Sequence, residues 1–180
     1  MAELILAGFG GQGVMSMGQM LAYAGMLEQK KVSWIPSYGP EMRGGTANCA
    51  VVITDEEIGS PVVVEPDVVV AMNLPSMDKF EPVIKPGGVL LYNSSLIERK
   101  VVRDDIIVLA IPANEIANEL GNTRVANMVM MGALLAQTGI VSVESIKKGL
   151  KQVLPSHRQD LIEVNQQAME RGSKLAKKQS

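Results

Sequence analysis

The order of hydrophobic and polar residues predicts strands that alternate with helices over the first two thirds of the chain. Residues 4–7 form a short apolar run that stops at Gly8, and residues 68–72 are continuously apolar. Runs of this kind are typical of parallel strands that are covered on both faces. From residue 12 to about residue 28, apolar side chains recur at helical spacing. Further strands are expected at 32–35, 89–92 and 106–111, and a short helix is expected at 76–84.

Residues 46–54 have a different pattern, because apolar side chains occupy one face and mixed side chains occupy the other. This alternation predicts a half-buried strand toward an edge of the sheet. Pro36 is expected to open the loop that precedes it. Residues 58–64 are expected to return as a ribbon that Pro61 interrupts.

The chain from residue 114 onward is expected to be mostly helical. Residues 125–137 are apolar nearly all round, which predicts a buried helix, and further helices are expected at 143–154 and 159–177. The whole pattern predicts an α/β fold with a single domain over residues 1–180. We expect a three-layer sandwich with a mostly parallel, Rossmann-like sheet, an antiparallel edge element and a helical C-terminal part.

Charge and composition exclude several classes of protein. Seventeen basic and nineteen acidic side chains give a net charge of −2, so neither a nucleic-acid surface nor an anionic membrane surface is expected. No apolar run approaches the ~20 residues of a membrane span, and the N-terminus has no basic region, so we expect a cytoplasmic protein. The single cysteine excludes disulfides, and it excludes iron–sulfur or zinc-thiolate ligation by this chain alone.

The first candidate site is the glycine-rich turn of residues 8–13, which fits G-x-G-x-x-G between a predicted strand and a predicted helix. Glycines allow a tight turn and close approach to a ligand, and a helix N-terminus offers free N–H groups to an anion. A dinucleotide site also needs an acidic residue at the end of the second strand, where this chain has Ser37. A purely structural turn, another anion or cofactor site, and a subunit contact all remain open. An NAD site is the weaker interpretation.

The second candidate site is the segment of residues 37–45. It combines a tyrosine, an acid, a base, a proline and three glycines within nine residues. Proline restricts the backbone and Gly44-Gly45 frees it, so the segment is expected to present Tyr38, Glu41 and Arg43 in a defined shape. The alternative is a surface ion pair between Glu41 and Arg43, worth under ~1 kcal/mol.

Together with the glycine-rich turn, this segment resembles the gamma subunit, or gamma domain, of 2-oxoacid:ferredoxin oxidoreductases. The resemblance continues in order over nearly the whole chain. The supporting segments are Asn48-Cys49 and residues 58–61, 66–71, 85–88 and 127–134.

The resemblance implies a role in a multi-subunit enzyme that converts a 2-oxoacid, coenzyme A and oxidised ferredoxin to acyl-CoA, CO₂ and reduced ferredoxin. Thiamine diphosphate, Mg and [4Fe-4S] clusters are expected on alpha, beta and ferredoxin-like delta partner subunits. This chain has one cysteine and no G-D-G…N motif, so it is expected to hold none of these cofactors alone. Its gamma-type domain is expected to line the coenzyme A side of the active site. The residues expected to face coenzyme A are Gly10, Gly11, Gln12, Gly13, Tyr38, Glu41, Arg43, Gly44, Gly45 and Asn127.

No residue of this chain is expected to be catalytic. His157 is expected to be solvated or bonded to a helix cap, and Cys49 and the methionines at 128, 130 and 131 are expected to fill the core. The resemblance is compatible with 2-oxoglutarate, pyruvate or branched-chain 2-oxoacids, and 2-oxoglutarate is favoured. A self-contained NAD-binding dehydrogenase and a non-catalytic scaffold subunit are the alternatives. The isolated chain is expected to form a homodimer.

Overall fold

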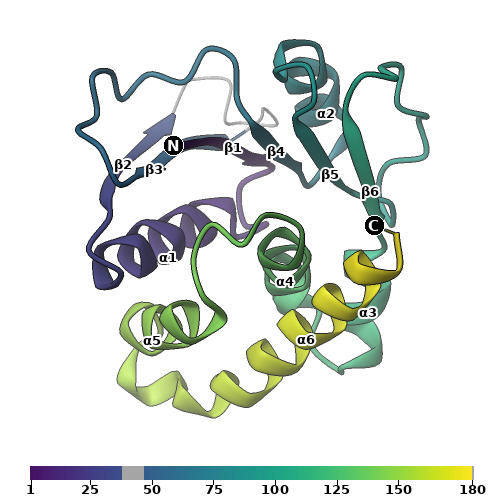
Figure 1. The fold of residues 1–180 in the computed structure, drawn as a ribbon. Coiled ribbons are helices and arrows are strands. Elements are labelled where there is room, and N and C mark those ends of the chain that lie inside the picture. The colour runs from purple at the N-terminus through teal and green to yellow at the C-terminus, as the bar shows by residue number, and fades with distance from the viewer. Residues whose placement is uncertain (38–46, 180) are drawn as a thin grey trace.

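A computed structural model of the chain describes residues 1–37 and 47–179, and Figure 1 shows their arrangement. Within these described residues, six strands form one sheet in the order β2-β3-β1-β4-β5-β6. Pairing is parallel from β1 through β4 and β5 to β6, which confirms the mostly parallel sheet. The strands are β1 (Ala2–Gly8), β2 (Lys31–Ser37), β3 (Ala47–Thr54), β4 (Val68–Ala71), β5 (Val89–Asn93) and β6 (Ile107–Ile111).

The antiparallel element is β3, and it lies one strand in from the edge. It pairs antiparallel with both β1 and β2, so β2 is the edge strand. Pro36 does not open a loop, because β2 continues to Ser37. A proline is tolerated there because an edge strand has a partner on one side only.

The prediction of a ribbon at residues 58–64 is wrong, because residues 55–67 contain neither helix nor strand. Pro61 removes a ladder donor, and the Ser60 hydroxyl accepts a hydrogen bond from the Val62 N–H at 3.2 Å. Such a local hydrogen bond closes a turn and competes with strand pairing.

The helices form two layers with the sheet between them (Figure 1). Helix α2 (Leu74–Phe80), continued by η2 (Glu81–Val83), covers one face, and the remaining helices cover the other. This arrangement confirms the three-layer sandwich and the helical C-terminal part. The remaining helical elements are α1 (Val14–Leu27), α3 (Ala113–Glu119), η3 (Thr123–Val125), α4 (Ala126–Thr138), α5 (Val143–Val153), η4 (Ser156–Leu161) and α6 (Ile162–Gln179).

Alternate residues of the strands supply the two cores. On β1, Leu4 and Leu6 pack in the larger core with α1 and α4, whereas Ile5 and Ala7 pack in the smaller core with α2. This is the period of two that a strand covered on both faces requires.

Helices α4 and α6 cross at very short range in the larger core. A Cβ atom added to Gly132 of α4 would lie 1.9 Å from the carbonyl oxygen of Met169, and one added to Gly172 of α6 would lie 1.8 Å from that of Val129. The two backbones therefore touch directly at glycine positions. At its N-terminal end, α4 lies beside the glycine-rich turn, where Asn127 contacts Gly13.

Candidate functional site

The crevice at the carboxyl ends of β1 and β4 is the expected place for a ligand. Helix α1 follows β1 on one face of the sheet and α2 follows β4 on the other, so the chain connections diverge between these strands (Figure 1). In open α/β sheets, ligands bind outside the carboxyl ends of the strands at such a switch point. Two adjoining hollows that share Gly11 form this strand-end crevice. Its described lining residues are Phe9, Gly10, Gly11, Gln12, Gly13, Val14, Met15, Ser16, Ala47, Met72, Asn114, Thr123, Arg124, Ala126 and Asn127.

The glycine-rich turn exposes its backbone to the crevice. Gly11 and Gly13 have φ values of 89° and 79°, in the left-handed region that favours glycine. A Cβ atom at Gly10 or Gly11 would meet nothing within 4 Å, so their backbone faces open space. A Cβ atom at Gly13 would lie 2.4 Å from the Asn127 side chain. Gly13 is therefore required by packing, whereas Gly10 and Gly11 leave room for a ligand.

Asn127 joins the turn to the first turn of α4. Its side chain is 9% exposed, and its Nδ2 donates to the carbonyl oxygen of Gly13 at 3.4 Å. The structure thus brings Asn127 together with Gly10, Gly11, Gln12 and Gly13, although 114 residues separate it from the last of these.

The side chain of Gln12 stabilises the glycine-rich turn through hydrogen bonds. Its Oε1 accepts from the Phe9 N–H at 2.6 Å and from Asn73 Nδ2 at 3.3 Å, and its Nε2 donates to the Met72 carbonyl at 3.3 Å. The side-chain amide of Gln12 is therefore committed to tying the turn to the end of β4. The chain's own hydrogen bonds thus use the side-chain amide of Gln12, which the sequence prediction assigned to a cofactor.

Two buried asparagines at the ends of β4 and β5 hydrogen-bond residues that line the crevice, and sequence reasoning missed both. Asn73 follows β4, and its Oδ1 caps α2 by accepting from the Ser76 N–H at 2.9 Å. Asn93 ends β5 fully buried, and its Nδ2 donates to Asn114 Oδ1 at 2.7 Å. The signal in the sequence is an asparagine directly after each apolar run.

The electrostatics of the crevice favour an anion. None of its described lining residues is acidic, and Arg124 is exposed with no ion pair among residues 1–37 and 47–179. Helix α1 begins at the crevice without a side-chain cap, whereas α4 continues directly from η3, whose start Asn122 caps by accepting from the Arg124 N–H at 3.0 Å. The first N–H groups of α1, at Val14, Met15 and Ser16, have no partner within their helix. Uncapped helix N-termini beside a guanidinium attract phosphate or carboxylate groups.

Five predicted site residues lie outside the described residues. They belong to the connection between Ser37 at the end of β2 and Ala47 at the start of β3, and Ala47 itself lines the crevice. The five residues are Tyr38, Glu41, Arg43, Gly44 and Gly45, and their assignment stays a prediction.

The residues set aside as non-catalytic lie where expected. Cys49 is fully buried, and burial raises the pKa of its thiol to about 11, as expected for a core residue. His157 is exposed in η4, and the three methionines at 128, 130 and 131 are at most 1% exposed. Across residues 1–37 and 47–179, no three metal-ligating side chains gather into one site. No helix in this part of the chain is long and apolar enough to cross a bilayer.

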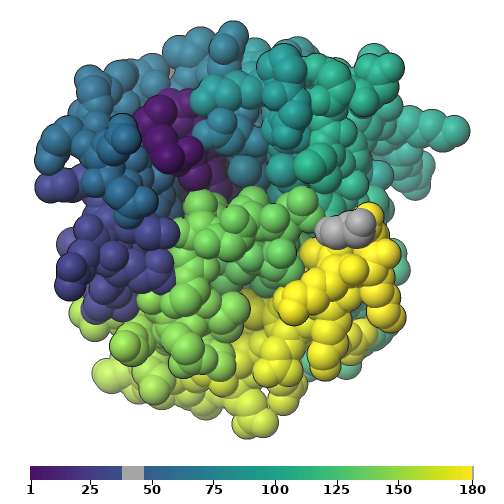
Figure 2. Space-filling model, viewed as in Figure 1, coloured from purple at the N-terminus to yellow at the C-terminus, as the bar shows by residue number. Residues whose placement is uncertain are grey.

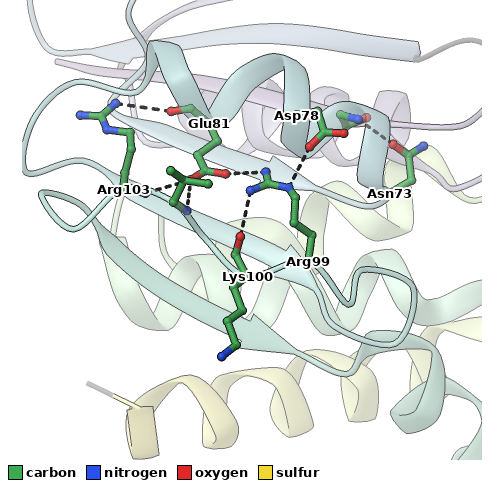
Figure 3. Close-up of polar contacts among 8 residues, drawn as sticks. Asn73, Asp78, Glu81, Arg99, Lys100 and Arg103 are labelled. Atoms are coloured by element: carbon green, nitrogen blue, oxygen red, sulfur yellow. Dashed lines mark hydrogen bonds and ion pairs between the residues drawn. The ribbon is translucent and has the colours of Figure 1, made fainter.

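A buried carboxylate organises the segment between β5 and β6 (Figure 3). Glu81 is 3% exposed and accepts from Arg99 at 2.5 Å, and from the N–H groups of Val102 and Arg103 at 2.7 Å and 3.1 Å. Burial raises the pKa of Glu81, but the hydrogen bonds from Arg99 and from these two backbone groups outweigh it and lower the pKa. Both carboxylate oxygens of Glu81 accept hydrogen bonds from this segment, so Glu81 holds the segment in place.

Comparison with known proteins gives a consistent result. Residues 3–175 match the family described as "POR: Pyruvate ferredoxin/flavodoxin oxidoreductase". The 2-oxoglutarate synthase subunit KorC of Methanocaldococcus jannaschii is 39% identical over 178 residues, which cover 97% of this chain and 94% of KorC. The ketoisovalerate oxidoreductase subunit VorA of Methanothermobacter marburgensis is 42% identical over 175 residues, 96% of this chain. The chain spans only 36% of the length of that VorA.

Two solved structures share the fold. The gamma subunit of keto/oxoacid ferredoxin oxidoreductase from Geobacter sulfurreducens has a TM-score of 0.85 and 32% identity, covering 99% of each chain. The 2-oxoglutarate:ferredoxin oxidoreductase of Magnetococcus marinus, with 2-oxoglutarate, coenzyme A and succinyl-CoA bound, has a TM-score of 0.89 and 26% identity. The match covers 98% of this chain and 31% of that one.

Proposed function

Because the chain belongs to the pyruvate ferredoxin/flavodoxin oxidoreductase family, we propose that it is the gamma subunit of a multi-subunit 2-oxoacid:ferredoxin oxidoreductase. The enzyme would oxidatively decarboxylate a 2-oxoacid to acyl-CoA and CO₂. Support comes from relatives named as subunits of such enzymes and from the similar Geobacter gamma subunit, which matches over 99% of both chains.

Within that complex, the strand-end crevice binds the phosphate-bearing part of coenzyme A. The observation that carries this proposal is the meeting of the uncapped N-terminus of α1 with Arg124 in a crevice whose described lining has no carboxylate. The open backbone at Gly10 and Gly11 offers N–H groups to phosphate oxygens, and Asn127 holds the turn against α4. Bound there, coenzyme A would supply the thiol that accepts the acyl group.

The residues of this chain bind and position, and the redox chemistry belongs to its partners. We assign thiamine diphosphate, Mg and [4Fe-4S] clusters to alpha, beta and ferredoxin-like delta subunits, with ferredoxin as the electron acceptor. A single buried cysteine among the 180 residues supports this division, because cluster ligation uses several thiolates.

For the substrate, we propose 2-oxoglutarate as the first 2-oxoacid to test. KorC, named as a 2-oxoglutarate synthase subunit, matches this chain over 94% of its own length. Other relatives are named for ketoisovalerate and pyruvate, so these acids are the competitors. In the assembled enzyme, kcat/KM for 2-oxoglutarate should exceed that for 2-oxoisovalerate and for pyruvate. A higher kcat/KM for either competitor would overturn the substrate assignment.

A self-contained NAD-binding dehydrogenase is the second candidate, and the strand order argues against it. The acid that holds the ribose of NAD sits at the end of a parallel strand beside the first strand. Here β1 lies between the antiparallel β3 and the parallel β4, and β4 ends at Ala71 followed by Met72 and Asn73, with no acid. Strand β2 ends at Ser37 two strands from β1, a separation of ~9–10 Å. Isothermal titration should find NAD affinity no tighter than millimolar, near −4 kcal/mol.

The decisive experiment is reconstitution with alpha, beta and cluster-bearing partner subunits. The assembled enzyme should reduce a viologen dye only when a 2-oxoacid and coenzyme A are both present. The isolated chain should be colourless and inactive, with or without added thiamine diphosphate. Turnover by the isolated chain would refute the subunit assignment.

Two arginine variants test the coenzyme A site within the assembled enzyme. Arg43→Ala and Arg124→Ala should each raise the KM for coenzyme A about tenfold, or ~1.4 kcal/mol, with the KM for the 2-oxoacid unchanged. Lys151→Ala is the matched control, because Lys151 is exposed on α5 and lines neither hollow of the crevice.

If Arg43 instead binds a partner subunit, the Arg43→Ala complex should lose the gamma subunit on a sizing column. If Arg43 only pairs with Glu41, neither the KM for coenzyme A nor the amount of gamma subunit in the complex should change. An unchanged KM in both arginine variants would overturn the proposed coenzyme A contact.

A further inference from the structure

A groove lies between α4, α5 and α6, on the helical layer that Figure 2 shows where green and yellow segments meet. Its floor is formed by Gly132 and Leu135 of α4 and by Met169 of α6, and Val143 of α5 stands 44% exposed at its side. The groove encloses about 200 Å³. Small-molecule sites usually hold ~300–1,000 Å³, so this space better suits one or two side chains of a protein partner.

Lysines surround this α4–α5–α6 groove. Lys147 stands on the α5 wall, and Lys174 and Lys177 stand on the α6 wall. Lys147 pairs with Glu144 at 3.0 Å, but neither lysine of α6 has an ion pair within the described residues. One acid, Glu170, lines the groove with them. The rim therefore carries a net positive charge above an apolar floor.

The C-terminal part of the chain, which includes α5 and α6, is positively charged, whereas the rest of the chain is negatively charged. Residues 143–180 contain eight basic and four acidic side chains, a net charge of +4. Residues 1–142 contain nine basic and fifteen acidic side chains, a net charge of −6. A near-neutral protein thus concentrates its positive charge on the helices that form the groove, which favours an acidic partner there.

We propose that the α4–α5–α6 groove docks an acidic amphipathic helix of a partner protein. One apolar side chain of that helix would pack on Val143, Leu135 and Met169, and acidic side chains on its flanks would pair with lysines on both walls. This is the helix-in-groove mode of recognition, with specificity added by charge. The surface is independent of the crevice, since Leu135 lies eight residues from Asn127 along α4, or ~12 Å.

Fluorescence anisotropy on the full chain tests the proposal with defined probes. The first probe is a labelled 18-residue helical peptide with leucines at i, i+3, i+4 and i+7 spacing and glutamates on both flanks. The second probe has the same leucines with lysines in place of the glutamates. Anionic lipid vesicles and a 20-base-pair DNA duplex serve as polyanion comparisons.

Two triple variants locate the binding. In Lys147→Gln/Lys174→Gln/Lys177→Gln, affinity for the acidic peptide should fall at least tenfold and its salt dependence should flatten. The matched control is Lys148→Gln/Lys151→Gln/Lys178→Gln, which removes the same charge from the same two helices outside the groove lining and should change affinity less than twofold. Val143→Asp, at an exposed position, should weaken binding tenfold without unfolding the chain.

The expected result is binding of the acidic peptide alone, weakened only by the groove variants. Equal loss in both triple variants would overturn the proposal, because it would show attraction to charge without a defined surface. Preferential binding of DNA or of vesicles would overturn it in favour of another polyanion. Failure of the acidic peptide to bind at 50 mM salt would also refute it.

Discussion

Replacing Gly172 by alanine should separate α4 from α6. The added methyl group would lie 1.8 Å from the Val129 carbonyl oxygen and 2.8 Å from its carbonyl carbon. Real Cβ atoms essentially never approach another heavy atom within 3.0 Å, so one helix must retreat by about 1.2 Å. Both obstructing atoms belong to backbone, and no rotamer change relieves the contact.

The expected cost follows from two opposing terms. Forcing a methylene-sized group into a packed core usually costs 1–3 kcal/mol of stability. Because backbone atoms obstruct the new methyl group, we expect a cost of about 3 kcal/mol for Gly172→Ala. Alanine recovers ~1 kcal/mol, because it is the better helix former. We therefore expect the free energy of unfolding to fall by about 2 kcal/mol. For a domain of this size, such a loss lowers Tm by ~4–8 °C.

Gly149→Ala in α5 is the matched control. A Cβ atom there would lie 3.4 Å from the Tyr23 ring and 3.5 Å from the Met20 carbonyl oxygen, both close to ordinary contact. The helix-propensity term then dominates, so Gly149→Ala should leave stability unchanged or raise it by up to ~1 kcal/mol. Urea unfolding followed by circular dichroism at 222 nm measures both variants. A Gly172→Ala protein as stable as the Gly149→Ala protein would refute this account of the crossing.

Three further outcomes are expected. Burial raises the pKa of Glu28, but hydrogen bonds from Ser142 and Ser145 and the charge of Lys30 lower it to about 2. The contribution of Glu28 to stability is therefore complete above pH 4.5 and is lost as the pH falls toward 2. Glu28→Gln should therefore cost ~1 kcal/mol at pH 7, allowing for solvent screening, and flatten acid unfolding between these pH values. Gly13→Ala should lower stability in urea by ~2 kcal/mol because of its φ of 79° and its contact with Asn127, whereas Gly10→Ala should be neutral. The isolated chain should sediment as a dimer, and a strict monomer at high concentration would contradict this.

The sequence predicted the elements whose pattern is continuous and long. Residues 68–72 are apolar throughout and contain the strand β4 (Val68–Ala71), and the apolar run at 125–137 corresponds to the buried helix α4 (Ala126–Thr138). Prediction failed where tertiary position decides the structure. Pro36 stays inside β2 because that strand lies at an edge, and no local pattern shows that β3 lies between β1 and β2.

The candidate site was only partly predictable from the sequence. The glycine-rich turn is visible as a motif, but Asn127 was assigned through family resemblance, and its contact with Gly13 depends on how α4 crosses the sheet. Arg124 was missed because an arginine between two helical segments has no spacing signal of its own. Asn73 and Asn93 were missed because an asparagine directly after a strand usually indicates a turn.

Close approach between backbones is the physical feature that the α4–α6 crossing and the glycine-rich turn have in common. Gly132 and Gly172 let α4 and α6 touch, and Gly13 lets the first turn of α4 reach the turn after β1 through Asn127. A side chain at any of these positions would push α4 outward and open the contact that holds the turn. The crevice therefore depends on three glycines that need touch no ligand, while Gly10 and Gly11 keep the space in which a ligand would lie.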